Sequence, residues 1–276
     1  MPLVFAAIAP HGGIAIAEAC APEERDVALK TRAGMEELGR RFAAARPEVV
    51  IVATPHNVHI SNALGVVVAS RVAGRLDGVT PPIELDIGCD TELAWRVLES
   101  FGAAGLSAAG VSFGSNEPGT AVAPMDWGVL IPLWFMGGRN ESPAPLVIVT
   151  PARDLPASDH VTAGAALAAA AVASDRRIAL IASADHGHAH APTGPYGYHP
   201  AAAEYDRLVT DAVSNNRLDD LTTFSRELVE NAKADSWWQM LILAGALGRG
   251  WRGQLLSYEC PTYVGLMCAA YAPDGH

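Results

Sequence analysis

The 276-residue sequence is poor in basic side chains: 19 Lys and Arg stand against 30 Asp and Glu, which gives a formal net charge of −11. Nucleic acids and anionic membrane surfaces are bound by clusters of basic residues. We therefore expect no nucleic-acid partner and no membrane partner. A small local basic pocket for an anionic substrate is compatible with this balance.

Cysteines and long hydrophobic runs are also scarce. Four cysteines without a Cys-x-x-Cys pair do not make a disulfide framework in a chain of this length, so they indicate reduced thiols. The longest featureless apolar stretch, residues 163–173, is rich in alanine and too short to cross a bilayer. The first residues lack the basic segment of a signal peptide. We expect a cytoplasmic protein.

Apolar residues suffice for a large core, since 50% of the chain is hydrophobic and 18% is charged. Short runs rich in Val, Ile and Leu alternate with helical patterns. Nearly continuous apolar runs are typical of strands covered on both faces, and their alternation with helices is typical of layered α/β folds. We predict an α/β fold: a single layered domain over residues 1–276, with a central mostly parallel or mixed sheet flanked by helices. Strands are predicted at 2–9, 49–53, 64–69, 146–149 and 178–182, and helices at 24–45, 91–101, 159–173, 201–214, 218–231 and 235–247.

Histidines follow three of the predicted strands. His11 follows the first in "APHGG", His56 follows the second in "VATPHNVH", and the strand at 178–182 runs into "ADHGHAH", which contains His186, His188 and His190. In open α/β sheets ligands bind in the crevice outside the carboxyl ends of the strands. If these strands are parallel neighbours, their histidines converge on one site. A single histidine at a strand end is more often a hydrogen-bonded structural residue.

Converging imidazoles suggest a metal. Neutral imidazole binds Zn, Cu, Fe and Ni, and two histidines with one carboxylate leave open positions, as in non-haem Fe(II) oxygenases. Glu259 in "LLSYECPTYVG" is the candidate carboxylate, because a charge in an otherwise apolar stretch is costly unless it is paired or bound to metal. A strand-end glutamate that faces water is the alternative.

Taken together, these segments resemble the class III, LigB-type extradiol ring-cleaving dioxygenases. The segments "APHGG", "VATPHNVHI", "DWGVLIPLWFM", "IASADHGHAH" and "LSYECPTYVG" follow the family's order over nearly the full chain. The resemblance implies Fe(II) held by His11, His56 and Glu259. It also implies that His188 is the acid/base in the cleavage of a catechol-like or 2-aminophenol-like ring by O2. His186 and His190, two residues before and after His188, are the alternatives for the acid/base role.

The sequence departs from the family pattern at two places. Gly187 stands where the family often has Ser, and Trp127, after Asp126, stands where many members have His or Tyr. Asp126, Trp127 and His59 are the candidates for substrate binding. For His59 a structural role is an equal alternative, and Trp127 is also expected as apolar pocket wall. Asp185 is expected either to support a histidine or to cap the turn that follows it.

Two other functions fit the same residues. The "HGHAH" segment is similar to the His-x-His clusters of zinc-dependent hydrolases, although it lacks the Asp-His that usually continues them. A non-catalytic metal-binding relative of the same fold is the other alternative. The resemblance implies a small aromatic substrate and O2 as partners. It also implies either a homo-oligomer or a complex with a small partner subunit.

Overall fold

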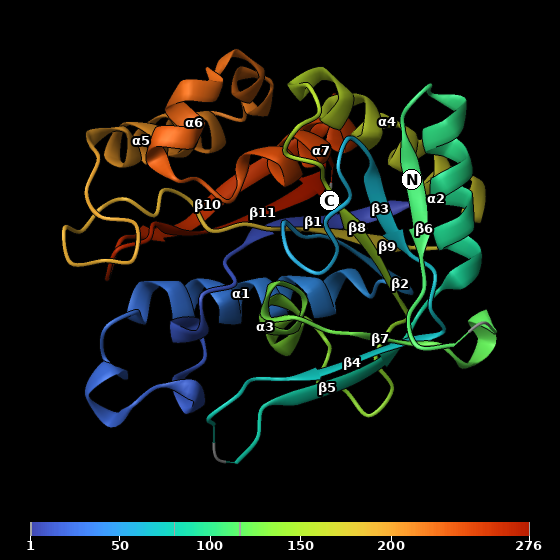
Figure 1. The fold of residues 1–276 in the computed structure, drawn as a ribbon, viewed down its shortest axis with the longest axis horizontal. Helices are drawn as coiled ribbons and strands as arrows, with labels where there is room; N and C mark the ends of the chain where they lie inside the picture. The colour runs from blue at the N-terminus through green and yellow to red at the C-terminus, as the bar shows by residue number, and fades with distance from the viewer. Residues whose placement is uncertain (1, 80, 116, 276) are drawn as a thin grey trace.

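An eight-stranded sheet forms the centre of the molecule in the computed structural model, which describes residues 2–79, 81–115 and 117–275 (Figure 1). The β1, β9, β2 and β8 strands are neighbours and run parallel. β11 is antiparallel to β1 and β10, while β3 is antiparallel to β8 and parallel to β6. The order across the sheet is β10 (Trp251–Glu259), β11 (Leu266–Pro273), β1 (Leu3–Ala9), β9 (Ile178–Ser183), β2 (Val49–Ala53), β8 (Leu146–Thr150), β3 (Leu64–Val67) and β6 (Ala108–Val111).

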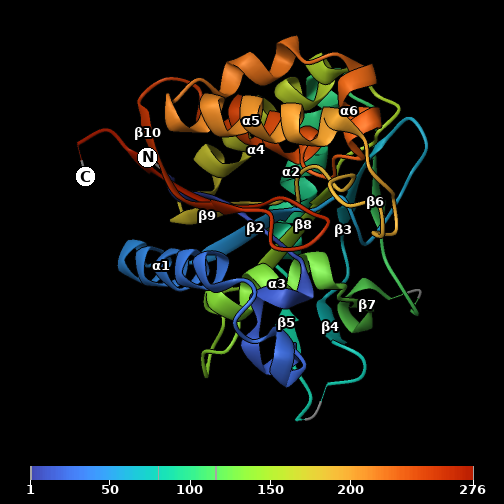
Figure 2. The same ribbon diagram turned by 90° about the vertical axis from the view of Figure 1, so that its left-hand side faces the viewer.

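Helices cover both faces of this sheet, as Figures 1 and 2 show. One face carries α2 (Thr91–Ala103), α4 (Ala157–Ser174), α5 (Pro200–Ser214), α6 (Arg226–Ala232) and α7 (Trp237–Leu247). The other carries α1 (Leu29–Ala45), α3 (Trp127–Phe135) and a small second sheet of β5 (Glu84–Gly88), β4 (Arg71–Arg75) and β7 (Val122–Pro124). The α/β prediction is therefore confirmed.

Alternate residues of the central strands enter two separate cores. In β2, Val49 and Ile51 pack with the helices of the first face, whereas Val50 and Val52 pack with α1, α3 and the small sheet. Because successive side chains of a strand point to opposite faces, a strand covered on both sides must be apolar at every position. This explains the uninterrupted apolar runs of the sequence.

Several predicted boundaries differ from the observed ones. The helix predicted at 24–45 begins only at Leu29, after the 3-10 turns η1 (Gly13–Ala15), η2 (Ala17–Ala19) and η3 (Pro22–Glu24). The helix predicted at 218–231 is divided into the 3-10 helix η5 (Leu218–Thr223) and α6, because Ser225 accepts a hydrogen bond from the backbone N–H of Leu228 and so starts a new helix. A further 3-10 turn, η4, spans Pro118–Thr120.

The expectations about cysteines and membrane spans can be compared with the coordinates. All four cysteines are free thiols. Within the described ranges, no helix combines the length and the hydropathy that crossing a bilayer requires.

Candidate metal centre

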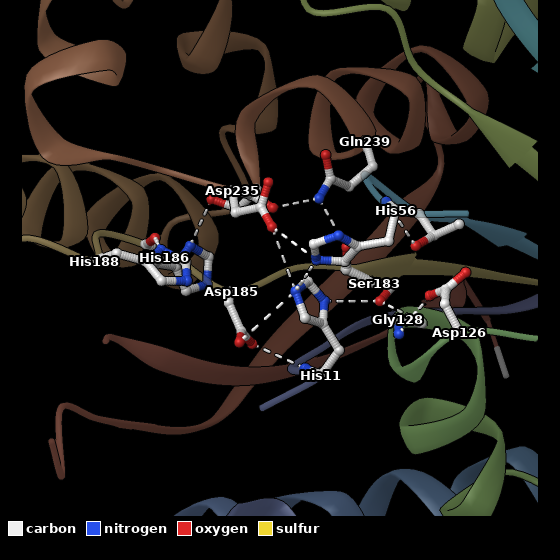
Figure 3. A network of polar contacts seen from close by, with 12 residues as sticks. His11, His56, Asp126, Gly128, Ser183, Asp185, His186, His188, Asp235 and Gln239 are labelled. Atoms are coloured by element: carbon white, nitrogen blue, oxygen red, sulfur yellow. Dashed lines mark hydrogen bonds and ion pairs between the residues drawn. The ribbon is translucent and has the colours of Figure 1, made fainter. Parts of the chain in front are cut away.

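Three side chains from distant parts of the sequence meet at the carboxyl ends of the parallel strands (Figure 3). His11 follows β1, His56 follows β2, and Asp235 precedes α7. The two Nε2 atoms are 3.2 Å apart, and Asp235 Oδ2 lies 3.5 Å from that of His11 and 3.0 Å from that of His56. Ligand atoms at right angles around one first-row metal ion are separated by about 3 Å. The three atoms therefore fit a single metal ion.

The His11 ring is held in the tautomer that metal binding requires. Ser183 Oγ donates its hydrogen to the carbonyl oxygen of Gly128 at 2.5 Å, and it lies 2.9 Å from His11 Nδ1. A hydroxyl has one hydrogen, so Ser183 must accept a hydrogen bond from His11 Nδ1. The neutral ring then carries its lone pair on Nε2, the atom that faces His56 and Asp235.

The position of His56 depends on a glycine at the start of α3. The ring of Trp127 packs against the His56 ring with centroids 4.5 Å apart. A Cβ at Gly128 would lie 2.6 Å from Thr54 Oγ1 and 3.0 Å from His56 Cδ2. Only glycine lets α3 approach the His56 ring this closely.

Asp235 is buried but has several partners. Its Oδ1 pairs with Arg153, whose guanidinium group also lies 4.8 Å from the ring centroid of Trp238. Gln239 donates from Nε2 to the backbone oxygens of Asp235 and Ser183. Burial by itself would raise the pKa of Asp235, but the His11 and His56 rings, when protonated, and the charge of Arg153 hold that pKa well below its usual range. The carboxyl group is therefore ionised and available as a ligand.

A second carboxylate, that of Asp185, supports His11. Its Oδ1 accepts a hydrogen bond from the His11 backbone N–H at 2.8 Å, and its Oδ2 lies 3.7 Å from His11 Nε2. Burial would lower the pKa of His11, but the charges of Asp185 and Asp235 outweigh burial and raise it above 6.5. Of the two roles expected for Asp185, the structure shows support of a histidine.

Glu259 does not join His11 and His56, so the sequence-based choice of the carboxylate was wrong. Its Oε1 accepts hydrogen bonds from the backbone N–H of Thr31 at 2.6 Å and from Thr31 Oγ1 at 2.7 Å. Thr31 lies in the first turn of α1, so Glu259 caps this helix. The strand that carries it, β10, is two strands away from β1, which corresponds to about 10 Å across a sheet.

The three histidines after β9 have separate environments. His186 is fully buried, and its Nδ1 lies 3.0 Å from Ser236 Oγ; burial lowers its pKa. His190 Nε2 lies 2.9 Å from Asp206 Oδ2. His188 is half-buried, and its Nδ1 lies 2.8 Å from the carbonyl oxygen of His186. A carbonyl only accepts, so neutral His188 carries its hydrogen on Nδ1 and its lone pair on Nε2.

The loop of His188 is tied to the segment that carries Asp235. The backbone N–H of His188 donates to the Ala232 carbonyl at 2.9 Å, and the N–H of Asp235 donates to the Asp185 carbonyl at 3.2 Å. Aromatic rings flank the His188 ring: the centroid of Tyr196 is 5.4 Å away and that of Tyr263 is 6.0 Å away.

The three predicted substrate-binding residues occupy different positions. Trp127 is 50% exposed beside His56 and therefore forms part of the wall of the site. Asp126 begins α3, and its Oδ1 accepts a hydrogen bond from the Gly128 N–H at 2.6 Å. His59 is exposed in the loop between β2 and β3.

Comparison with known proteins identifies the family of this chain. The profile of the family described as "Catalytic LigB subunit of aromatic ring-opening dioxygenase" matches residues 5–268, which is nearly the whole chain. The chain belongs to the LigB family. The enzymes of this family bind a metal, and among the residues that the structure describes His11, His56 and Asp235 form a group that could hold one.

Two relatives can be compared with this LigB chain. Protein CA_C1420 of Clostridium acetobutylicum is 24% identical over 259 residues, which cover 93% of this chain and 54% of that protein. The chain thus spans about half the length of this curated relative. The crystal structure of an uncharacterized protein, JW3007, from Escherichia coli K12 superposes with a TM-score of 0.61 at 16% identity. The match covers 97% of this chain and 99% of that one, and it shows a shared fold.

Sequence reasoning missed Asp235, Arg153, Ser183 and Gln239. Asp235 precedes a helix whose residues are all apolar except Gln239, a pattern that reads as an ordinary helix start. The signal in the sequence was the apolar character of this helix. An almost entirely apolar helix is buried, as α7 is along nearly its whole length, and a carboxylate at its start is then buried with it.

Proposed function

We propose that this protein is a dioxygenase that opens a catechol-like or 2-aminophenol-like ring with O2, next to the ring's hydroxyl or amino substituents. In this proposal Fe(II) is held by His11, His56 and Asp235, and His188 is the acid/base. The observation that supports it most is the meeting of two Nε2 atoms and one carboxylate oxygen within 4.8 Å of one another. Membership of the LigB family supports the reaction type.

The donor set suits a ferrous ion. Two imidazoles and one carboxylate on one side of an octahedral ion are the ligands of many non-haem iron oxygenases. When bound, the ion would supply open ligand positions and the one-electron chemistry that the reaction of a ring with O2 requires. Ser183 keeps the lone pair of His11 on Nε2, and Arg153 keeps Asp235 ionised without occupying its Oδ2.

The hydrogen bond of His188 supports the proposed role of its ring as a proton carrier. Its Nδ1 hydrogen is engaged by the His186 carbonyl, so Nε2 is the atom that accepts a proton from a ring hydroxyl and later returns it. Tyr196 and Tyr263 beside His188 and Trp127 beside His56 offer flat surfaces on which an aromatic ring can pack.

Anaerobic reconstitution with Fe(II), followed by oxygen uptake with a panel of catechols and 2-aminophenols, tests this function. We expect about one iron per chain, one O2 consumed per ring, and a coloured ring-opened product. Stoichiometric zinc with no oxygen uptake would favour a hydrolase. Bound iron with no turnover on any ring would favour a non-catalytic relative.

The His188→Gln variant tests the role of the side chain. We expect turnover to fall by about 10²–10⁴-fold while the iron content stays at the wild-type level. Loss of iron in this variant would place His188 among the ligands instead and would contradict its role as the acid/base.

A further inference from the structure

A second buried carboxylate lies outside the metal centre. Asp206 in α5 is 1% exposed, and it accepts three hydrogen bonds. Its Oδ1 accepts from the backbone N–H of Gly187 at 2.8 Å, and its Oδ2 accepts from Tyr258 Oη at 2.7 Å and lies 2.9 Å from His190 Nε2. Burying a carboxylate is costly, and this one is stabilised by donors from two separate segments.

Two of these donors lie on either side of His188 in the sequence. Gly187 precedes it and His190 follows it by two residues, so Asp206 holds the loop at both ends. Several other hydrogen bonds of this loop join backbone groups: the His186 N–H donates to the Gly265 carbonyl at 2.9 Å, and the Gly265 N–H donates to the Gly187 carbonyl at 3.0 Å. Asp206 adds a charged acceptor to this otherwise neutral network, and hydrogen bonds to a charged group are the stronger kind.

Two glycines make room for the Asp206 carboxylate. A Cβ at Gly187 would lie 3.0 Å from Asp206 Oδ1 and 3.0 Å from the backbone oxygen of Ala202, and a Cβ at Gly265 would overlap Asp206 Oδ2. The loop, α5 and the start of β11 therefore approach one another closely around this side chain. A small shift of Asp206 must move the backbone that carries His188.

We propose that Asp206 is a positioning residue that fixes the His186–His190 loop, so that His188 keeps its Nδ1 hydrogen on the His186 carbonyl and presents Nε2 to the substrate. This inference rests on the proposed function for its effect on turnover. Its structural part, the fixed orientation and tautomer of His188, is independent of that function.

The Asp206→Asn variant tests the proposal in the full-length protein. An amide keeps the size of the side chain but loses the charge and one of the two acceptor oxygens. We expect kcat to fall by about 10- to 100-fold, since small misplacements of a reacting group have effects of this size. KM and iron content should stay close to the wild-type values, because Asp206 contacts neither the metal ligands nor the substrate wall.

Asp90→Asn is the matched control. Asp90 is also buried, with 7% exposure, and it caps α2 and pairs with Arg176. Asp90→Asn also removes the charge of a buried, hydrogen-bonded carboxylate, but this carboxylate lies outside the site. We therefore expect the kcat of Asp90→Asn to equal that of the wild type. Equal losses of kcat in the two variants, or a loss that follows the iron content, would make Asp206 merely structural and would overturn the proposal.

A second measurement does not depend on turnover. Nitrogen-15 NMR of the histidine side chains should show the Nδ1–H tautomer of His188 in the wild type and a mixture of tautomers in Asp206→Asn. If the wild type opens no ring, the proposed function fails, and this comparison still decides the positioning role. Wild-type kcat or an unchanged tautomer in the variant would overturn that role.

Tyr258→Phe covers the case in which Asp206→Asn does not fold. This variant removes one of the three donors and leaves the carboxylate in place. We expect a smaller loss of kcat in the same direction, with a smaller change in the tautomer signal. A Tyr258→Phe protein that is identical to the wild type in both measurements would overturn the proposal in that case.

Discussion

Ser183 Oγ joins His11 Nδ1 to the carbonyl oxygen of Gly128, at 2.9 Å and 2.5 Å respectively. This hydroxyl links the end of β9 to the loop after β1 and to the first turn of α3. Removing it in Ser183→Ala leaves the ring of His11 free to rotate and to change its tautomer. We expect the affinity for Zn(II) or Fe(II) to fall by about 10- to 100-fold, measured by competition with a chelator.

Ser70→Ala is the matched control for that prediction. Ser70 Oγ also donates to a backbone carbonyl, that of Ala121, at 2.7 Å, but it lies in the turn that leads into β4. Its metal affinity should equal that of the wild type. A Ser183→Ala protein with unchanged affinity would show that His11 does not need this hydrogen bond.

Gly128→Ala should disturb the second histidine. The added methyl group would lie 3.0 Å from His56 Cδ2 and 2.6 Å from Thr54 Oγ1, so the ring of His56 has to move. Overpacking of this kind costs about 1–3 kcal/mol, which corresponds to a loss of metal affinity of about 5- to 150-fold if the whole cost falls on the metal-bound protein. Gly102→Ala in α2, where a Cβ meets nothing within 4 Å, should bind metal as the wild type does.

The assignment of the carboxylate ligand leads to opposite results for two conservative variants. Asp235→Asn should bind little metal, because it removes the charge that lies 3.0 Å from His56 Nε2. Glu259→Gln should keep its metal and instead lose about 0.5–2 kcal/mol of unfolding free energy, because it weakens the cap of α1. Metal analysis and urea unfolding of both proteins measure this. Full occupancy in Asp235→Asn, with loss of metal in Glu259→Gln, would restore the sequence-based assignment.

The outcome for these two carboxylates shows what the sequence could and could not indicate. His11 and His56 were predictable together, because each ends an apolar run and the carboxyl ends of parallel strands meet at one edge. The third candidate ligand, Asp235, lies at the start of a helix. The periodicity of the sequence does not predict which helix begins at that edge of the sheet. Glu259 looked like a ligand because it is charged in an apolar stretch, but the backbone N–H and the hydroxyl of Thr31 at the start of α1 satisfy its carboxylate equally well.

The same distinction holds for the fold. The central strands were predictable because both of their faces are buried, which forces an apolar residue at every position. The small sheet was missed because its strands are short and partly exposed: β4 contains Arg71 and Arg75, and β5 contains Glu84 and Asp86. These strands pair because they pack against α3 and the core on that face of the central sheet. Contacts between segments that are distant in the sequence cannot be predicted from a short sequence window.

A pH dependence of stability follows from His160, a histidine of α4 that lies away from the metal centre. Its side chain is fully buried, and its Nδ1 lies 2.9 Å from the Pro156 carbonyl oxygen. Burial lowers the pKa of this histidine below 6.5, although the hydrogen bond to Pro156 opposes the effect. Below pH 6.5 the unfolded chain therefore binds a proton at this position that the folded protein does not bind.

The free energy of unfolding must then fall as the pH falls through 6.5, by up to about 1.4 kcal/mol per pH unit for one proton. Urea unfolding of the metal-free protein between pH 5.5 and 7.5 measures the slope in the wild type and in His160→Gln. The variant should have the smaller slope, and the contributions of other histidines cancel in the difference. Equal slopes for His160→Gln and the wild type would mean that His160 binds its proton as readily in the folded protein as in the unfolded chain, which would contradict the lowered pKa.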